Sequence, residues 1–432
     1  MLAVALARQV DALWIAFLES GASPLETMEQ ITGLIADRGL GAFGIRVPEL
    51  LDEAIALLDS PQMQDPTAQR TTYEYLIGKL TTAQSGPVVT PRHIIRLMID
   101  LVEPTPDDTI IDPSAGTGGF LVAAGEYLRE HHPRLWADAE LRDDLEAPTL
   151  TGLDSDASMR DVASMNLRLH GITRPTISHR DVLEVDGAGL SAGSFSLLLA
   201  NPPLAGLRDA AVTAKELLQV VGTRKPELLF LVRALTLLCA GGRAAVIVPD
   251  SVLYGTSKAH VTVRRILVEE HSLEAVVRLP PGVFRPASTR SASILLFRKQ
   301  GVTDFVWFYD VRADGFTLDD DRSPTEGDDL PDVAARWRSL SASPSMLDGP
   351  GEIDDVTSAS RATRARTAQS FSVPRAEIAG QGYDLTFNRY GFVFAERLSH
   401  RTPNEILIEV ARLELQIQRA AAELARSLND PL

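Results

Sequence analysis

Apolar side chains recur at steps of three and four residues over the first 80 positions, which places them on one face of a helix. Proline and glycine residues interrupt this pattern and divide it into short segments. The sequence therefore predicts a small helical cap over residues 1–84. Three apolar sets carry the pattern: Leu2, Leu6, Val10, Leu13 and Phe17; Leu50, Ile55, Leu57 and Leu58; and Tyr73, Leu76, Ile77 and Leu80.

After residue 85 the pattern changes to short, β-prone apolar runs that alternate with helical ones. Alternation of this kind predicts an α/β fold with a mainly parallel sheet that is covered on both faces. A further helix is predicted after Thr90-Pro91. Strands are predicted at 109–111, 149–154, 176–178, 195–200, 243–248, 273–279 and 293–298, and helices at 121–128, 157–170, 226–240 and 257–270.

The last third of the chain is less regular. Residues 312–330 are rich in aspartate and glycine, which predicts a solvated loop, and residues 341–370 are typical of a flexible linker with a small basic patch. A capping box at 402–405 then opens a helix with a heptad seam, which needs a partner surface on this protein or on another chain. The seam consists of Ile406, Val410, Leu413, Ile417, Ala420 and Leu424.

Composition narrows the class of protein. With 432 residues, 45% hydrophobic and 23% charged, the chain has room for two or three globular domains. Its single cysteine, Cys239, lies in a predicted helical run and excludes disulfides and a cysteine-rich metal site. No apolar run reaches membrane-spanning length and residues 1–18 lack a signal-peptide pattern, so we expect a cytoplasmic protein.

The formal net charge of −16 argues against broad, non-specific binding of the chain alone to nucleic acid. A protein of this charge that acts on DNA would need local basic patches or a partner that supplies them. One locally basic segment, 205–225, lies after a predicted strand, and contact with phosphates and a solvated loop are equal alternatives for it.

The glycine-rich stretch at 112–120 lies between a predicted strand and a predicted helix. A strand, a glycine-rich turn and a helix form a nucleotide-type pocket at the carboxyl end of the strand, because glycines let backbone N–H groups approach a ligand. A tight structural turn is the alternative for this stretch taken alone. The candidate ligand-binding residues are Asp112, Pro113, Ser114, Gly116, Gly118, Gly119 and Phe120.

A second stretch, Asn201-Pro202-Pro203-Leu204, also follows a strand-like apolar run. Asparagine at a strand end followed by two prolines gives a stiffened turn that presents an amide side chain. A plain loop is the alternative for this stretch alone.

Together and in this order, the two stretches resemble those of N6-adenine DNA methyltransferases, above all the modification (M) subunit of type I restriction–modification systems. The resemblance runs from about Thr90 to Lys299 and returns at Gly382–Leu385 and Asn388–Tyr390. It implies a Rossmann-like, class I S-adenosylmethionine-dependent methyltransferase with an N-terminal helical domain and a C-terminal helical tail. We accordingly divide the chain into an N-terminal helical domain (1–84), a catalytic domain (85–312), a loop and linker segment (313–370) and a partner-binding region (371–432).

The resemblance assigns roles around S-adenosylmethionine. Thr90 and Pro91 match a turn that touches the methionine part, although Val89 replaces the usual aromatic residue and a plain helix cap explains Thr-Pro nearly as well. Asp154, which ends the second strand, can accept hydrogen bonds from both ribose hydroxyls. Asp181 matches the residue near the adenine amino group, and a surface turn is the alternative.

The resemblance also implies a mechanism and partners. Asn201 and the Pro202 carbonyl would accept hydrogen bonds from the target amino group of an adenine that has left the duplex. The motif normally ends in Phe or Tyr, whereas here it ends in Leu204, so an active enzyme, a subunit with lost or slow methylation and a methyltransferase for a small amine stay open. The implied partners are DNA and a DNA-specificity subunit bound by the C-terminal helix. A restriction subunit or self-association is a further alternative.

Overall fold

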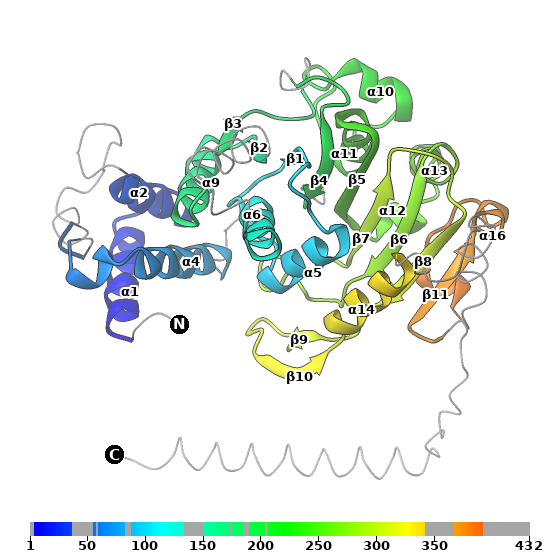
Figure 1. The fold of residues 1–432 in the computed structure, drawn as a ribbon. Coiled ribbons are helices and arrows are strands. Elements are labelled where there is room, and N and C mark those ends of the chain that lie inside the picture. The colour runs from blue at the N-terminus through cyan, green and yellow to red at the C-terminus, as the bar shows by residue number, and fades with distance from the viewer. Residues whose placement is uncertain are drawn as a thin grey trace, which may run out of the picture. The chain divides into compact units, whose positions relative to one another are not determined.

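The computed structural model describes residues 4–36, 55–57, 59–82, 88–133, 150–172, 175–184, 190–203, 206–341 and 367–391 (Figure 1). Several positions singled out in the sequence lie outside these ranges. They are Leu2, Leu50, Leu58, Leu204, most of the predicted linker and the whole heptad seam.

Nine strands form one sheet among the described residues, in the order β11-β8-β6-β7-β5-β4-β1-β2-β3. Strand β1 lies between β2 and β4 and runs parallel to both, while β7 runs antiparallel to its neighbours β5 and β6. The predicted, mainly parallel sheet is therefore confirmed, and β7 is a reversed strand within it. The strands are β1 Ile110–Asp112, β2 Leu150–Asp154, β3 Thr176–His179, β4 Phe195–Ala200, β5 Leu238–Pro249, β6 Ser272–Arg278, β7 Ala292–Arg298, β8 Phe305–Asp310 and β11 Ser370–Pro374.

Helices cover both faces of this sheet (Figure 1). Side chains that alternate along each central strand enter two different cores: Leu198 packs in one, and Leu197 and Leu199 pack in the other. Because both faces are buried, the strands are continuously apolar rather than alternating. One core receives α10 Lys215–Val221, α11 Pro226–Leu237, α12 Ser251–Tyr254 and α13 Lys258–Arg265, and the other receives α5 Arg92–Val102, α6 Gly119–His131 and α14 Leu330–Ser341.

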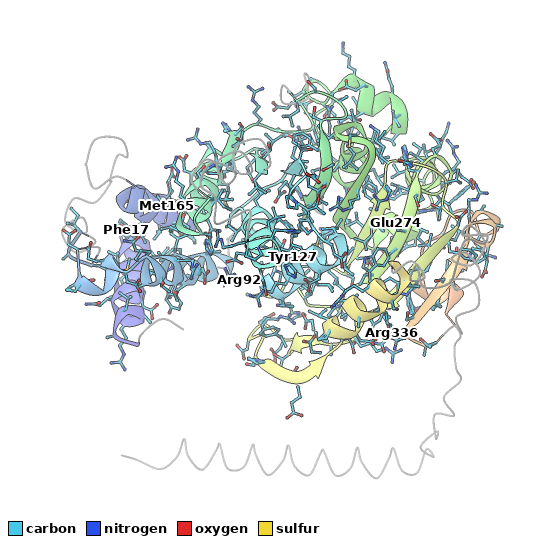
Figure 2. All side chains as sticks on the ribbon, viewed as in Figure 1. Phe17, Arg92, Tyr127, Met165, Glu274 and Arg336 are labelled. Carbon is cyan, nitrogen blue, oxygen red and sulfur yellow. The ribbon has the colours of Figure 1, made fainter. Side chains whose placement is uncertain are left out.

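The N-terminal helices form a third core against α9 (Ala157–Leu169). Phe17 and Met165, labelled in Figure 2, lie in this core. The Tyr73 hydroxyl lies 3.0 Å from the Val162 carbonyl oxygen of α9, so the helical region is tied to the sheet domain by a buried polar contact as well as by apolar packing. These helices are α1 Val4–Glu19, α2 Pro24–Ala36, η1 Pro61–Gln64 and α4 Pro66–Thr82.

Two predictions about the second half of the chain were wrong. The helix predicted to reach residue 240 ends at Leu237, and Cys239 lies in β5, because Leu238 pairs with Phe195 of β4 and makes the backbone extended. The predicted solvated loop at 312–330 contains a hairpin, β9 Asp314–Phe316 and β10 Pro324–Asp328, and the Asp314 side chain is fully buried.

The sheet also extends beyond the predicted strands. Strand β8 pairs in parallel with β6, and β11 closes this side of the sheet antiparallel to β8. Phe371 of β11 and Tyr390, which follows this strand in the sequence, pack in the same core as α11 and α13. Two short helices, α16 Arg375–Gly380 and α17 Phe387–Tyr390, follow β11. The four-part division of the chain stays a prediction.

The described helices do not include a candidate membrane span. In the part of the chain that the structure describes, each helix is too short or too polar to cross a lipid bilayer.

Candidate functional site

Asp112 is the last residue of β1 and is fully buried. One carboxyl oxygen, Oδ1, accepts hydrogen bonds from the Ser114 backbone N–H at 3.0 Å and from the Ser114 hydroxyl at 3.4 Å. The other, Oδ2, is buried and has no hydrogen-bond partner among the described residues. Burial, with a smaller contribution from the nearby Asp154 carboxylate, raises the pKa of Asp112 to about 8. Such a carboxyl suits a ligand that brings a donor or a positive charge.

The glycine-rich turn after Asp112 is held between neighbouring elements. The Ala115 N–H donates to the Leu153 carbonyl at 2.8 Å, and the Gly116 N–H donates to Asp154 Oδ2 at 2.8 Å. Gly118 has φ +77°, and a Cβ there would lie 3.2 Å from the Leu167 side chain of α9. The turn therefore requires glycine both for its backbone conformation and for the close approach of α9.

The remaining residues of the turn differ in burial: some pack in the hydrophobic core and others are partly exposed at the site. Phe120 is buried among core side chains with Leu121, so its structural role is packing. Pro113 is also buried, whereas Ser114 and Gly119 are partly exposed. The structure thus brings the predicted turn residues together at one strand end, but Phe120 faces the hydrophobic core.

Asp154 ends β2, the strand next to β1. Its Oδ1 accepts from the Asp156 N–H at 2.9 Å and its Oδ2 accepts from Gly116, so each oxygen keeps a lone pair for a ligand. Burial raises the pKa of Asp154, while the backbone donors of Asp156 and Gly116 oppose this rise. The side chain is partly exposed and remains accessible to a polar ligand.

Asp181 lies beside the end of β2, because the N–H of its neighbour Arg180 donates to the Asp154 carbonyl at 2.7 Å. Its Oδ1 accepts from the Leu183 N–H at 2.9 Å, which is a turn contact, and its Oδ2 forms an ion pair with Arg208. The structure therefore brings Asp181 to the predicted site but gives it protein partners. Its role towards a cofactor stays a prediction.

Asn201 follows β4 directly, on the other side of β1 from Asp154. Its side-chain Nδ2 donates to the Thr90 hydroxyl at 2.9 Å. Its Oδ1 is buried and has no hydrogen-bond partner among the described residues. Pro202 is buried and Pro203 is exposed, and the burial of Oδ1 shows that the asparagine amide points inward.

The alternative that Thr90 caps the next helix was wrong. Helix α5 begins at Arg92 with Pro91 at the capping position, and no side-chain hydrogen bond caps it. The Thr90 hydroxyl contacts Asn201 instead, 111 positions away in the sequence. A proline at the cap leaves the helix start without a side-chain acceptor and leaves the threonine free for a tertiary contact.

A cavity of about 810 Å³ adjoins this edge of the sheet. Glu74, which contributes to its wall from α4, pairs with Arg92 of α5 at 2.7 Å, and Arg92 is labelled in Figure 2. The cavity does not reach Asp112, Asp154 or Asp181, so it is a neighbour of the candidate cofactor site. Its lining includes Thr90, Pro91, Thr117, Gly119, Phe284 and Phe316.

One polar cluster at the cavity was not found from the sequence. Asp314 Oδ2 lies 3.0 Å from His93 Nε2 and also pairs with Arg322, while the Phe316 and His93 rings stack with centroids 4.7 Å apart. Burial raises the pKa of Asp314, but hydrogen bonds from His93 and Arg322 outweigh it and lower the pKa below its ordinary value. The sequence signals were the position of His93 three residues after Thr90 and the aspartate-rich stretch that contains Asp314.

Comparison with known proteins decides the family. Residues 69–398 match the family described as N-6 DNA Methylase. The chain belongs to the N-6 DNA methylase family. The resemblance inferred from the two sequence stretches is thereby confirmed.

Two relatives from Escherichia coli are methylase subunits of type I restriction enzymes. The chain is 28% identical to the EcoEI methylase subunit over 364 residues, 83% of this chain and 68% of that protein. It is 31% identical to the EcoKI methylase subunit of strain K12 over 265 residues, 56% of this chain and 48% of that protein. The matches thus span about half to two thirds of the length of these relatives.

Solved structures agree with the fold. One chain in a structure on complex assembly and conformational transition of the type I R-M system has a TM-score of 0.65 and 26% identity, over 96% of this chain and 81% of that one. The crystal structure of the EcoKI M protein has a TM-score of 0.55 and 22% identity, over 99% and 96%, which shows the fold alone. The predicted Rossmann-like methyltransferase fold is confirmed.

Proposed function

We propose that this chain is the S-adenosylmethionine-dependent, N6-adenine-specific DNA methyltransferase subunit of a type I-like restriction–modification system. The observation that carries the proposal is the buried Asn201 Oδ1, which has no partner among the described residues and lies at the end of the strand beside β1. A buried acceptor without a donor is unfavourable unless a ligand supplies one. Membership of the N-6 DNA methylase family makes the adenine amino group the best candidate donor.

The residues around Asp112 fit S-adenosylmethionine. The unpartnered Asp112 Oδ2 suits the ammonium group of the methionine part, and Asp154 keeps acceptor capacity for the ribose hydroxyls. We assign the backbone of Gly116 and Gly118 to the close approach of the ligand, and Asp181 to the adenine amino group. When bound, the cofactor supplies an electrophilic methyl group.

Asn201 and Pro202 act on the target base in this proposal. The lone pair of adenine N6 is delocalised into the ring, and two acceptors on its hydrogens favour the tetrahedral nitrogen that is needed for attack. The base must leave the duplex to present this nitrogen, at a cost of a few kcal/mol. Holding the amino group at fixed acceptors then contributes through positioning.

The test is transfer of labelled methyl from S-adenosylmethionine to duplex DNA by the full chain with its partner subunit. Asn201→Ala should remove the transfer, while Asn388→Ala, which changes an exposed asparagine in α17, should not. Sequencing of N6-methyladenine in cells with and without the gene is the matching measurement in vivo. Equal methylation by Asn201→Ala and the unmodified protein would exclude the proposed role of Asn201.

The proposed function includes a partner, a DNA-specificity subunit. We assign the helix predicted over 403–428 to contact with a DNA-specificity subunit, in agreement with the net charge of −16, which makes independent binding to DNA unfavourable. Deletion of 403–428 should abolish co-purification with that subunit and leave cofactor binding intact. Tight, sequence-selective DNA binding by the chain alone at physiological salt would contradict this assignment.

A second candidate, a subunit with slow or lost methylation, is favoured by Leu204. Leucine gives an extruded base an apolar contact but no aromatic face, and base–aromatic stacking is worth roughly 1–3 kcal/mol per base. Capture of the base would weaken by roughly 5- to 150-fold. Leu204→Phe should then raise the methylation rate. A slower Leu204→Phe variant would mean that the site is built around leucine.

A further inference from the structure

We propose that Thr90 is a positioning residue, whose hydroxyl holds the Asn201 amide in place so that its oxygen can meet the target amino group. The proposal deepens the proposed function and rests on it. It assigns Thr90 a role different from the cofactor contact that the family resemblance implies for this turn.

The two ends of an asparagine amide have nearly the same shape but opposite hydrogen-bonding character. If the amide were reversed, its NH2 group would meet the N–H groups of the target and leave two donors facing each other. In the structure Nδ2 donates to the Thr90 hydroxyl at 2.9 Å, and Oδ1 is left buried and unpartnered among the described residues. Because a hydroxyl can donate as well as accept, this contact holds the amide in its place and plane, and the target N–H groups then favour the orientation in which Oδ1 faces them.

Thr90 is held in place by groups outside its own turn. It is 8% exposed and precedes Pro91, whose carbonyl accepts from the N–H groups of Ile94 and Ile95 at 3.0 Å each. One residue before Ile94, His93 contacts the buried Asp314 of the β9–β10 hairpin. The first turn of α5 is therefore fixed both by its own hydrogen bonds and by the hairpin, so the hydroxyl stays within reach of Asn201.

The variants separate the hydroxyl from the shape of the side chain. Thr90→Val keeps the volume and removes the hydroxyl, and Thr90→Ser keeps the hydroxyl. Thr303→Val is the matched control, because Thr303 is also buried and its hydroxyl is hydrogen-bonded to Leu273 and His271 at the opposite edge of the sheet. It exposes any effect of losing a buried hydroxyl as such.

The first readout is single-turnover methylation by the full chain with its partner subunit at saturating S-adenosylmethionine. Thr90→Val should slow this step by about tenfold, the loss expected for one hydrogen bond, while the dissociation constant for S-adenosylmethionine stays unchanged. Thr90→Ser should retain most of the rate, and Thr303→Val should match the unmodified protein. A weaker cofactor affinity with an unchanged saturated rate would overturn the proposal in favour of a cofactor contact.

The second readout does not need catalysis. The chain has five asparagines, so NMR of isotope-labelled asparagine side chains gives few signals, and Asn201→Ala identifies the one of interest. Thr90→Val should shift this signal and speed its hydrogen exchange, and Thr90→Ser should do neither. An unchanged signal in Thr90→Val would overturn the proposal. If the unmodified protein does not methylate DNA, the proposed function fails, and the NMR result still decides whether Thr90 holds the amide.

Discussion

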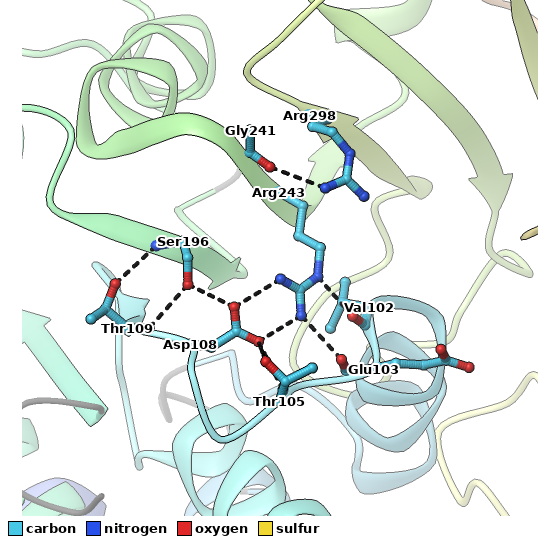
Figure 3. Close-up of polar contacts among 9 residues, drawn as sticks. All are labelled: Val102, Glu103, Thr105, Asp108, Thr109, Ser196, Gly241, Arg243 and Arg298. Atoms are coloured by element: carbon cyan, nitrogen blue, oxygen red, sulfur yellow. Dashed lines mark hydrogen bonds and ion pairs between the residues drawn. The ribbon is translucent and has the colours of Figure 1, made fainter. Parts of the chain in front are cut away.

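Asp108 and Asp112 stand at opposite ends of the same strand, and their surroundings are opposite. Asp108, before β1, accepts two hydrogen bonds from the Arg243 guanidinium at 2.9 and 2.7 Å, and one from the Ser196 hydroxyl at 2.6 Å (Figure 3). Asp112, at the carboxyl end, is fully buried and has one oxygen without a partner among the described residues.

The pKa values express this difference. Burial raises the pKa of Asp108, but hydrogen bonds and the charge of Arg243 outweigh it, so the pKa lies below its ordinary value. For Asp112 no cation among the described residues opposes burial, and the pKa rises to about 8. The buried carboxylate with a complete set of donors stabilises the fold, whereas the one with a free oxygen is available to a ligand.

Arg243 makes further structural contacts at the amino edge of the sheet, the edge at which β1 begins. Its Nε donates to the Val102 carbonyl at 2.8 Å and one Nη donates to the Glu103 carbonyl at 3.0 Å, at the end of α5 (Figure 3). One guanidinium thus joins α5, β5 and the segment before β1. Removal of either partner leaves the other charge buried and unpaired, which is strongly destabilising.

The largest expected effect is on stability at the amino edge. Asp108→Ala should lower the free energy of unfolding by about 3–5 kcal/mol, because it leaves Arg243 without its carboxylate. Denaturant-induced unfolding measures this, with Asp107→Ala, at an exposed neighbour, as the control. The cofactor affinity of the folded variant should stay unchanged. A loss below about 1 kcal/mol, the value typical of surface pairs, would break the comparison.

The next effect is on binding at the carboxyl edge. Asp112→Asn should weaken S-adenosylmethionine binding by roughly 10- to 150-fold, since it removes a charge-assisted hydrogen bond. It should not lower stability, because it removes a buried acid rather than an ion pair. Calorimetry and unfolding of the same sample check both statements. Unchanged affinity would refute the cofactor role of Asp112.

The third effect is on the pH dependence of binding. With a pKa of about 8, Asp112 is protonated in the free protein at lower pH and must lose its proton to accept an ammonium group. Affinity should therefore fall by about tenfold for each pH unit below that value and level off above it. Asp112→Asn should lack this contribution, and the ratio of the two proteins cancels the titration of the cofactor itself. A ratio that does not vary with pH would contradict the pKa argument.

The smallest effect compares two serines. Ser196→Ala removes a 2.6 Å hydrogen bond to Asp108 and should lower the free energy of unfolding by about 1.5–3 kcal/mol, the range for bonds to charged groups. Ser114→Ala removes a hydroxyl 3.4 Å from Asp112, a poor distance, and should have almost no effect. Equal losses in thermal or denaturant unfolding would show that the two edges do not differ in this way.

The sequence by itself determined which strand ends form the candidate site. Strand–turn–helix patterns predict a parallel sheet, and parallel strands end at the same edge, so Asp112, Asp154 and Asn201 had to lie near one another once their strands were neighbours. Gly118 was singled out as part of a ligand-binding turn, and the structure adds its positive φ and the close approach of α9.

The tertiary structure alone decided which polar groups from other parts of the chain contact the residues of this site and its surroundings. The Thr90–Asn201 contact joins positions 111 apart, and the His93–Asp314 contact joins positions 221 apart. Cys239 became part of a strand, against its local pattern, because β4 offers a partner at Leu238. Periodicity along the sequence gives information only about residues a few positions apart. The partners of buried polar atoms depend instead on how distant segments pack. The same packing determines which buried polar atoms have no partner and so mark the site.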